Sequence, residues 1–259
     1  TMNKLQSRNS LWFDDAYVQP QDGTFTSAPM QLSYSRLQSM ATAYAMDDGT
    51  YFTPTEKTNL RNDIVNAMDW MYANWYNTSL IPLNELPTFA NPYPFPDGLA
   101  WYDMTISIPT IISSILTLMG NEFTSTQVDN YTSAILYYNT DLEYAGTRGN
   151  TLMLGGNLAE KCLLFALVGA LRHDETYLLE ARDKSSTLFT YAVPYPNPKD
   201  TTSGDGGFYT DGSYIQHVGL PYLGNYGYVL VNSITKMLTL ISGTPWEVRD
   251  PNVVNMANW

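Results

Sequence analysis

The residues with the clearest chemical potential are a histidine and a tyrosine nine positions apart, His217 and Tyr226. They lie in residues 204–227, a stretch rich in glycine and tyrosine, where glycines let the backbone turn tightly and approach a ligand closely. An imidazole accepts a proton near neutral pH and a phenol can relay one, so the two could form an acid/base couple. A lone histidine in such a loop is more often a structural hydrogen-bonding group. The two residue types by themselves therefore leave both interpretations open.

The other histidine and the single cysteine are better explained by structure than by chemistry. His173 stands at the expected end of a helix, where a cation or a cap is favourable, and Cys162 stands in an apolar run typical of a buried side chain. Two distant histidines and one buried cysteine offer no metal-ligand spacing. We therefore expect no metal site and no cofactor.

The charge balance excludes one class of partner. The net charge is −12 and the pI is near 4.4, whereas nucleic-acid binding needs clustered Lys and Arg. No stretch approaches the roughly 18 apolar residues of a membrane span, so no membrane association is expected. The low content of charged residues and the 20 tyrosines suit an extracellular protein that handles sugars. The first residues carry no signal-peptide pattern, so export would be directed by a segment outside this chain.

The elements that must position these residues are helices. Thr53, Pro54 and Glu56 form a cap, a first-turn proline and an acid three residues after the cap, which together predict a helix. Thr124 with Gln127 repeats the capping pattern. Further helical periodicity is found at residues 31–46, 103–119, 124–138, 157–171, 174–190 and 226–242. With little strand pattern between them, these segments predict an all-α fold.

Two long connections interrupt the helices. Residues 77–100 hold five prolines, and residues 191–225 are rich in Gly, Pro and Tyr. Long connections within a compact domain are usually functional or disordered, and the aromatic residues in these two favour order. We find no tandem repeat at a fixed period, so we expect one domain over residues 1–259. In this domain, we expect a ring of antiparallel helix pairs. The long loops would lie together at one face of a cleft.

Six stretches, in the same order along the chain, resemble polysaccharide lyase family eight, the hyaluronate, chondroitin AC and xanthan lyases. The most specific is residues 211–217 (Asp-Gly-Ser-Tyr-Ile-Gln-His) followed by 221–227 (Pro-Tyr-Leu-Gly-Asn-Tyr-Gly). The other five are residues 30–37, 67–72, 101–103, 155–157 and 242–248.

The resemblance implies both a fold and a reaction. The fold is an incomplete α/α toroid, with antiparallel helical hairpins around a substrate cleft, which in the family is followed by a large β-sandwich region. The reaction is β-elimination on an acidic, uronic-acid-containing polysaccharide. The enzyme removes the C5 proton of the uronate and expels the oxygen at C4, which leaves an unsaturated sugar at the new non-reducing end.

The resemblance also implies the roles of three residues. Asn157 would bind the sugar carboxylate, and His217 and Tyr226 would be the proton-transfer pair. Removing a proton alpha to a carboxylate builds a second negative charge, and an amide donor stabilises that charge as it forms. Asn157 opens an expected helix, whose N-terminus would add favourable potential. A simple N-cap is the structural alternative for this residue. Which of His217 and Tyr226 is the base stays open.

The resemblance also implies substrate-binding residues. Trp101 and Tyr102 resemble the family's aromatic patch that stacks on sugar rings, although generic aromatics at a helix start are more often core residues. Asp103 would cap that helix. Asn225 lies within the signature loop and would contact the substrate.

Three departures from the family pattern affect what is expected of the chain. Ala100 stands where hyaluronate-lyase relatives usually carry Asn, and Leu158 stands where an Arg often follows the key Asn. The chain ends at Trp259, before the family's catalytic-site Arg and Glu. We therefore expect either a fragment of a larger secreted lyase, inactive or feeble without its β-sandwich region, or a domain that has lost catalysis. Hyaluronan, chondroitin and xanthan all stay possible, with Ala100 mildly against hyaluronan.

Two other functions compete with the lyase. A glycoside hydrolase on an α/α toroid would need two carboxylates flanking the bond; Asp205 and Asp211 are available, but no pair stands out. A non-catalytic carbohydrate-binding domain would keep the aromatics at Trp101 and Tyr102 and leave the acid/base pair unused.

Overall fold

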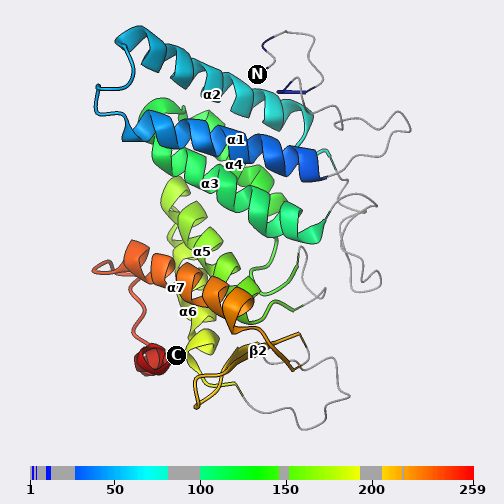
Figure 1. The fold of residues 1–259 in the computed structure, drawn as a ribbon, viewed down its shortest axis with the longest axis vertical. Coiled ribbons are helices and arrows are strands. Elements are labelled where there is room, and N and C mark those ends of the chain that lie inside the picture. The colour runs from blue at the N-terminus through cyan, green and yellow to red at the C-terminus, as the bar shows by residue number, and fades with distance from the viewer. Residues whose placement is uncertain are drawn as a thin grey trace. The chain divides into compact units, whose positions relative to one another are not determined.

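The computed structural model describes residues 2, 4, 10–12, 27–80, 100–145, 152–192, 206–217 and 219–259. The chain forms two compact units, Thr1–Thr140 and Asp141–Trp259, and each is described by itself (Figure 1). Much of the two connections expected from the sequence, namely residues 81–99 and 193–205, lies outside the described residues. The prediction of a single domain over residues 1–259 stays a prediction.

The described residues of the first unit form four α-helices. They are α1 (Ser27–Met46), α2 (Pro54–Asn74), α3 (Ile108–Met119) and α4 (Ser125–Tyr138). Helix α1 packs against both α2 and α3, and α4 packs against α2 and α3; α1, α2 and α3 run side by side in Figure 1. Their facing sides bury apolar residues such as Met30, Leu37, Met68, Ile112 and Ile135.

The two predicted capping boxes are both present. The Thr53 hydroxyl accepts a hydrogen bond from the Glu56 N–H at 3.3 Å, and the Glu56 carboxylate accepts one from the Thr53 N–H at 2.9 Å. Thr124 and Gln127 make the same reciprocal pair at the start of α4. Each box satisfies two N–H groups that have no partner inside the helix, which explains why the sequence pattern marks these helix starts correctly.

The helical stretch around α3 requires a correction to the sequence analysis. A π-helical turn, η2 (Asp103–Ser107), precedes α3 and a 3-10 turn, η3 (Gly120–Glu122), follows it. The run Asp103–Glu122 is long and apolar enough to cross a membrane by length and composition, contrary to the expectation that no stretch approaches this limit. However, 61% of its apolar window is buried inside the protein, which is typical of a core helix.

The second unit centres on α5 (Gly155–Arg172). Helix α5 packs against α6 (Glu175–Ser185) and α7 (Tyr228–Ile241) (Figure 1). Most residues of α5 are buried. A 3-10 turn, η4 (Ser186–Phe189), continues α6 and packs against the C-terminal 3-10 segment η6 (Pro251–Asn258). A helix that is apolar on nearly all sides must lie at the centre of its core.

A small antiparallel sheet completes this unit. Its order is β1 (Gly207–Phe208), β2 (Tyr214–Gln216) and β3 (Leu220–Pro221). Phe208 lies opposite Tyr214, and the Phe208 ring stacks on Trp259 with the centroids 4.8 Å apart. Strands of two or three residues are too short to give a periodic pattern, so the sequence did not predict them. The all-α class is confirmed, with this sheet as an addition.

The predicted helices differ from the observed ones mainly at their ends. The first helix starts at Ser27, four residues before the predicted residue 31, and α6 changes to a 3-10 turn at Ser186. The last predicted helix, residues 226–242, starts in a π-helical turn, η5 (Leu223–Gly227). Gly243 has a φ of +70°, consistent with the predicted stop, because glycine adopts this conformation without steric cost.

Candidate active site

The fold brings together the two residues that the sequence proposed as an acid/base couple. Nε2 of His217 lies 2.7 Å from the hydroxyl oxygen of Tyr226, and their ring centroids are 4.8 Å apart at an interplanar angle of 72°. His217 directly follows β2, and Tyr226 lies in η5. The hydrogen bond gives a direct path for a proton between the imidazole and the phenol.

Unusual backbone conformations hold both members of this pair. His217 has a φ of +51°, in the left-handed region that non-glycine residues rarely adopt. Tyr226 is carried by a π-helical turn, a form that is frequent at functional sites. Such conformations cost free energy and persist only where the surrounding structure imposes them.

A third ring, Tyr222, contacts both members of the pair. Its centroid lies 5.8 Å from that of His217 and 5.3 Å from that of Tyr226, in edge-to-face arrangements. The Tyr222 carbonyl accepts hydrogen bonds from the N–H groups of Asn225 (3.3 Å) and Gly227 (3.1 Å), so Tyr222 also starts the turn that carries Tyr226. Asn225 is exposed on the same turn. Tyr222 was not predicted from the sequence as a site residue.

The surroundings of Tyr226 favour its protonated form. Partial burial raises the pKa of the Tyr226 phenol above its usual value, and the neighbouring Tyr222 and Glu160 act in the same direction. The phenolate would be poorly solvated here and would face negative charge. Tyr226 therefore carries its proton in the resting protein at neutral pH.

Asn157 lies at the beginning of α5, as predicted, but it is not the N-cap. The N-cap position is Leu154, and Asn157 is the third residue of the helix with 8% of its surface exposed. Asn157 is therefore buried in the first turn of α5.

The backbone of α5 at Gly156 lies close to the backbone of η5 at Tyr226. A methyl group on Gly156 would lie 2.9 Å from the carbonyl oxygen of Tyr226 and 3.2 Å from its ring carbon Cδ1. Only glycine permits this contact without a shift of the neighbouring chain. The residue before Asn157 thus lies against Tyr226.

The predicted aromatic patch lies in the other unit. The rings of Trp101 and Tyr102 meet edge to face with centroids 5.8 Å apart; Tyr102 is 38% exposed and Trp101 is half-buried. They directly precede the π-helical turn η2. Asp103 is not the expected cap, because its carboxylate accepts a hydrogen bond from the Ser27 hydroxyl at 2.6 Å instead. The Ser27 hydroxyl also accepts the Ala100 N–H at 3.1 Å.

The residues expected to be structural behave as such. His173 ends α5 in a left-handed conformation with a φ of +54°. Cys162 is fully buried, and burial raises the pKa of its thiol. Asp211 is committed to a turn, because its carboxylate accepts hydrogen bonds from the Ser213 N–H and hydroxyl at 2.9 and 2.7 Å. Asp205, the other candidate carboxylate for hydrolysis, lies outside the described residues.

A buried lysine on α5 was missed by the sequence analysis. Lys161 is fully buried, its Nζ donates a hydrogen bond to the Tyr144 carbonyl at 3.0 Å, and it lies 5.6 Å from the centre of the Phe165 ring. Burial lowers the pKa of Lys161 to about 7, which the nearby carboxylate of Asp141 only partly offsets. Its position one helical turn after Asn157, inside an apolar run, could have drawn attention to it.

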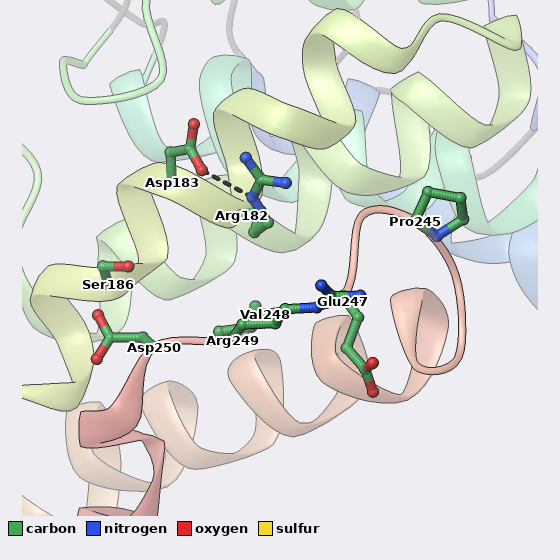
Figure 2. Close-up of a pocket in the computed structure, with 8 residues that line it drawn as sticks. All are labelled: Arg182, Asp183, Ser186, Pro245, Glu247, Val248, Arg249 and Asp250. Carbon is green, nitrogen blue, oxygen red and sulfur yellow. Dashed lines mark hydrogen bonds and ion pairs between the residues drawn. The ribbon is translucent and has the colours of Figure 1, made fainter.

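A separate pocket lies between α6 and the segment that follows α7 (Figure 2). It has a volume of about 320 Å³ and is lined by Arg182, Asp183, Ser186, Pro245, Glu247, Val248, Arg249 and Asp250. Arg182 is paired with Asp183 at 2.7 Å, and the Glu247 carboxylate accepts the Gly243 N–H at 3.4 Å. None of the candidate active-site residues lines this pocket.

The chain is similar to known proteins over its whole length. All residues, 1–259, match the family described as polysaccharide lyase family 8, N terminal alpha-helical domain. The chain is 25% identical over 260 residues to the xanthan lyase of Bacillus sp. (strain GL1), which covers 100% of this chain and 23% of that protein. It is 28% identical over 223 residues to the hyaluronate lyase of Thermasporomyces composti, which covers 86% of this chain and 24% of that protein.

Solved structures show the same helical fold. The Paenibacillus xanthan lyase superimposes with a TM-score of 0.76 and 29% identity, over 100% of this chain and 21% of that chain. The Streptomyces coelicolor A3 chondroitin AC lyase, in complex with chondroitin sulphate, gives a TM-score of 0.70 and 27% identity, over 94% and 28%. The present chain spans less than a third of the length of each of these relatives. The α/α-toroid assignment and the predicted family resemblance are confirmed, and because the family match includes every residue, the chain belongs to polysaccharide lyase family 8 as its N-terminal α-helical domain.

Proposed function

We propose that this chain is the helical part of an enzyme that cleaves an acidic, uronic-acid-containing polysaccharide by β-elimination. The observation that carries the proposal is the 2.7 Å contact between His217 and Tyr226, made beside the start of the helix that presents Asn157. The helical domains of lyases acting on related polymers support it. The proposal includes export from the cell, because such polymers are too large to be met inside it.

Asn157 is the proposed receptor of the sugar carboxylate. Its amide is largely shielded from water, so a hydrogen bond from it to the carboxylate is stronger than the same bond in solvent. As the C5 proton leaves, charge builds up on that carboxylate. A donor already in place stabilises this charge without reorganisation.

His217 is the proposed first proton acceptor in either of two routes. The raised pKa of Tyr226 leaves the phenol protonated at rest, so Tyr226 can take the C5 proton only by passing its own proton to His217. Alternatively, His217 takes the C5 proton directly. In both routes the C5–H bond breaks, the electron pair forms the C4–C5 double bond, and the C4–O bond breaks. A proton is then returned from the pair to the leaving oxygen.

Substrate positioning is assigned to two aromatic side chains and one amide side chain. Trp101 and Tyr102 would stack on sugar rings, which suits their partial exposure and edge-to-face packing. Asn225, exposed on the turn that carries Tyr226, would donate to sugar hydroxyls.

We also propose that a basic side chain from outside this chain helps to bind the acidic polymer. No Lys or Arg occurs between Arg61 and Arg148, so an acidic polymer near that part of the chain meets no basic side chain from it. We expect the family's β-sandwich region to supply one. The isolated chain should accordingly turn over slowly or not at all.

Ultraviolet absorbance tests the proposal, because the unsaturated product absorbs and a saturated hydrolysis product does not. The chain and the full-length natural protein are each incubated with hyaluronan, chondroitin and xanthan. A rise in absorbance with one polymer, abolished by Tyr226→Phe, would establish the reaction and name the substrate. No rise with any of them in the full-length protein would refute the lyase assignment for these polymers.

A further inference from the structure

The N-terminus of α5 has no cap of its own. The N-cap residue Leu154 makes no side-chain hydrogen bond to the helix. Instead, the Gly156 N–H donates to the Tyr214 hydroxyl oxygen at 3.1 Å and to Oε1 of Gln216 at 3.2 Å. The Tyr214 hydroxyl in turn donates to Oε1 of Gln216 at 2.5 Å. Two side chains of β2 therefore cap a helix that begins about 60 residues earlier in the chain.

This arrangement is buried, so its hydrogen bonds matter. Tyr214 is 1% exposed and Gln216 is 7% exposed. Burial raises the pKa of the Tyr214 phenol, which keeps its proton on the hydroxyl as a donor to Gln216. A buried polar group that loses its partner costs about 1–3 kcal/mol, so none of the three groups can leave the arrangement cheaply.

Glycines make room for these two side chains. A methyl group on Gly206 would lie 3.1 Å from Cδ of Gln216, and one on Gly227 would lie 3.1 Å from Cγ of Tyr214. Gly155 has a φ of +51°, and a methyl group there would collide with the Tyr214 hydroxyl. The two side chains are thus closely enclosed by the backbone at these three glycines.

Each candidate catalytic group is adjacent to one of these contacts. Asn157 follows Gly156, and His217 follows Gln216. The Tyr214 carbonyl accepts the N–H of Tyr222, the residue whose own carbonyl starts the turn that carries Tyr226. Small shifts in this arrangement would therefore change the spacing of Asn157 from both members of the acid/base pair.

We propose that Tyr214 and Gln216, here called the Tyr214–Gln216 clamp, are positioning residues that fix Asn157 relative to His217 and Tyr226. The inference rests on the proposed lyase function and deepens it. It also explains a neutral residue at position 216. A glutamate could accept the same two hydrogen bonds, but it would add a negative charge where Asn157 receives the sugar carboxylate.

A double-mutant cycle in the full-length natural protein tests the clamp. Tyr214→Phe removes one hydroxyl and should lower kcat about tenfold or more, since a small misplacement of a catalytic group is costly. In an Asn157→Ala background the same change should lower kcat by less than about twofold, because the group being positioned is already gone. An equal loss in both backgrounds, or no loss in either, would overturn the proposal.

The variant Gln216→Glu tests whether the clamp acts on the substrate site and not only on the stability of the fold. Gln216→Glu keeps both accepted hydrogen bonds, so the fold should be retained while KM for the acidic polymer rises about tenfold or more. Wild-type KM in Gln216→Glu would contradict the placement of the clamp beside the carboxylate site. The matched control is Tyr131→Phe, which removes another buried hydroxyl, bonded to Asp69 at 2.6 Å, and should lower thermal stability without changing kcat.

Failure of the clamp can be told apart from failure of the proposed function. Active wild-type protein with an additive cycle refutes the clamp alone. Inactive wild-type protein refutes the function, and the cycle is then measured on the Kd for the polymer. Non-additivity between Tyr214→Phe and Asn157→Ala in Kd would support the clamp, and additivity would refute it.

Discussion

The hydroxyl oxygen of Tyr226 lies 2.7 Å from Nε2 of His217, although the first residue belongs to a π-helical turn and the second follows a strand. The contact depends on a left-handed backbone at His217 and on the packing of Tyr222 against both rings. The fold thus places the two proposed proton-transfer groups within hydrogen-bond distance of each other.

Removing either member of the pair should abolish most of the elimination activity. Tyr226→Phe and His217→Ala each remove a proton-transfer group, which typically contributes about 10²–10⁴-fold to the rate. Turnover is followed by ultraviolet absorbance in the full-length natural protein. Tyr228→Phe is the matched control, because Tyr228 is 66% exposed two residues away and should behave as wild type. Equal losses in all three variants would contradict the assignment.

Asn157 should contribute mainly to the transition state. Asn157→Ala should lower kcat by about 10²–10³-fold, the usual loss when a donor to a developing negative charge is removed. Asn157→Asp should be at least as damaging, since it places a second carboxylate against that of the sugar. Steady-state kinetics on the polymer gives kcat and KM separately. A rise in KM alone would indicate that Asn157 binds substrate and transition state equally.

Gly156 should tolerate no side chain. In Gly156→Ala the new methyl group would lie 2.9 Å from the Tyr226 carbonyl oxygen, so α5 and η5 must move apart. We expect lower thermal stability together with at least tenfold lower kcat. Gly224→Ala is the matched control in the same turn, because nothing lies within 4 Å of a methyl group there. Unchanged activity in Gly156→Ala would show that the spacing is not critical.

Lys161 should make stability depend on pH. Burial lowers its pKa to about 7 in the folded chain, against 10.5 for the free side chain, so between these values the unfolded state binds more protons. The contribution of Lys161 to the free energy of unfolding should therefore rise as the pH rises from about 7 toward 10.5. Denaturant unfolding of wild type and of Lys161→Met at several pH values should show this rise in the difference between the two proteins.

Lys184 provides the control for that experiment. It is partly exposed and bonded to Glu143, which raises its pKa instead of lowering it. Lys184→Met should cost about 0–1 kcal/mol and leave the rise with pH in place. The same rise in Lys161→Met as in wild type would assign the pH dependence to another group.

The ring of Tyr222, and not its hydroxyl, should keep His217 and Tyr226 in position through its packing against both rings. Tyr222→Phe keeps the edge-to-face packing on His217 and Tyr226 and should keep kcat within about threefold, since such ring pairs are worth about 0.5–1.5 kcal/mol each. Tyr222→Leu loses both ring contacts and should lower kcat about tenfold or more. If Tyr222→Phe were as damaging as Tyr222→Leu, the hydroxyl itself would have a role.

Much of the local structure could be predicted from the sequence because its causes are local. Helical periodicity and the capping boxes at Thr53 and Thr124 depend on residues three or four positions apart, and these predictions were confirmed. The expected cap at Asp103 was wrong, and the structural alternative of an N-cap at Asn157 is not observed. In both places a distant residue replaces the local partner: Ser27 bonds the Asp103 carboxylate, and side chains of β2 cap α5.

By itself, the sequence determined the all-α class, the family and the residue types that could perform the chemistry. Only the tertiary structure decided that His217 meets Tyr226, that Tyr214 and Gln216 cap the helix of Asn157, and that Lys161 is buried. The physical reason is the range of the interactions. A cap or an amphipathic face is set by neighbours within one or two helical turns, whereas these contacts join segments up to 60 residues apart and exist only once the core has packed.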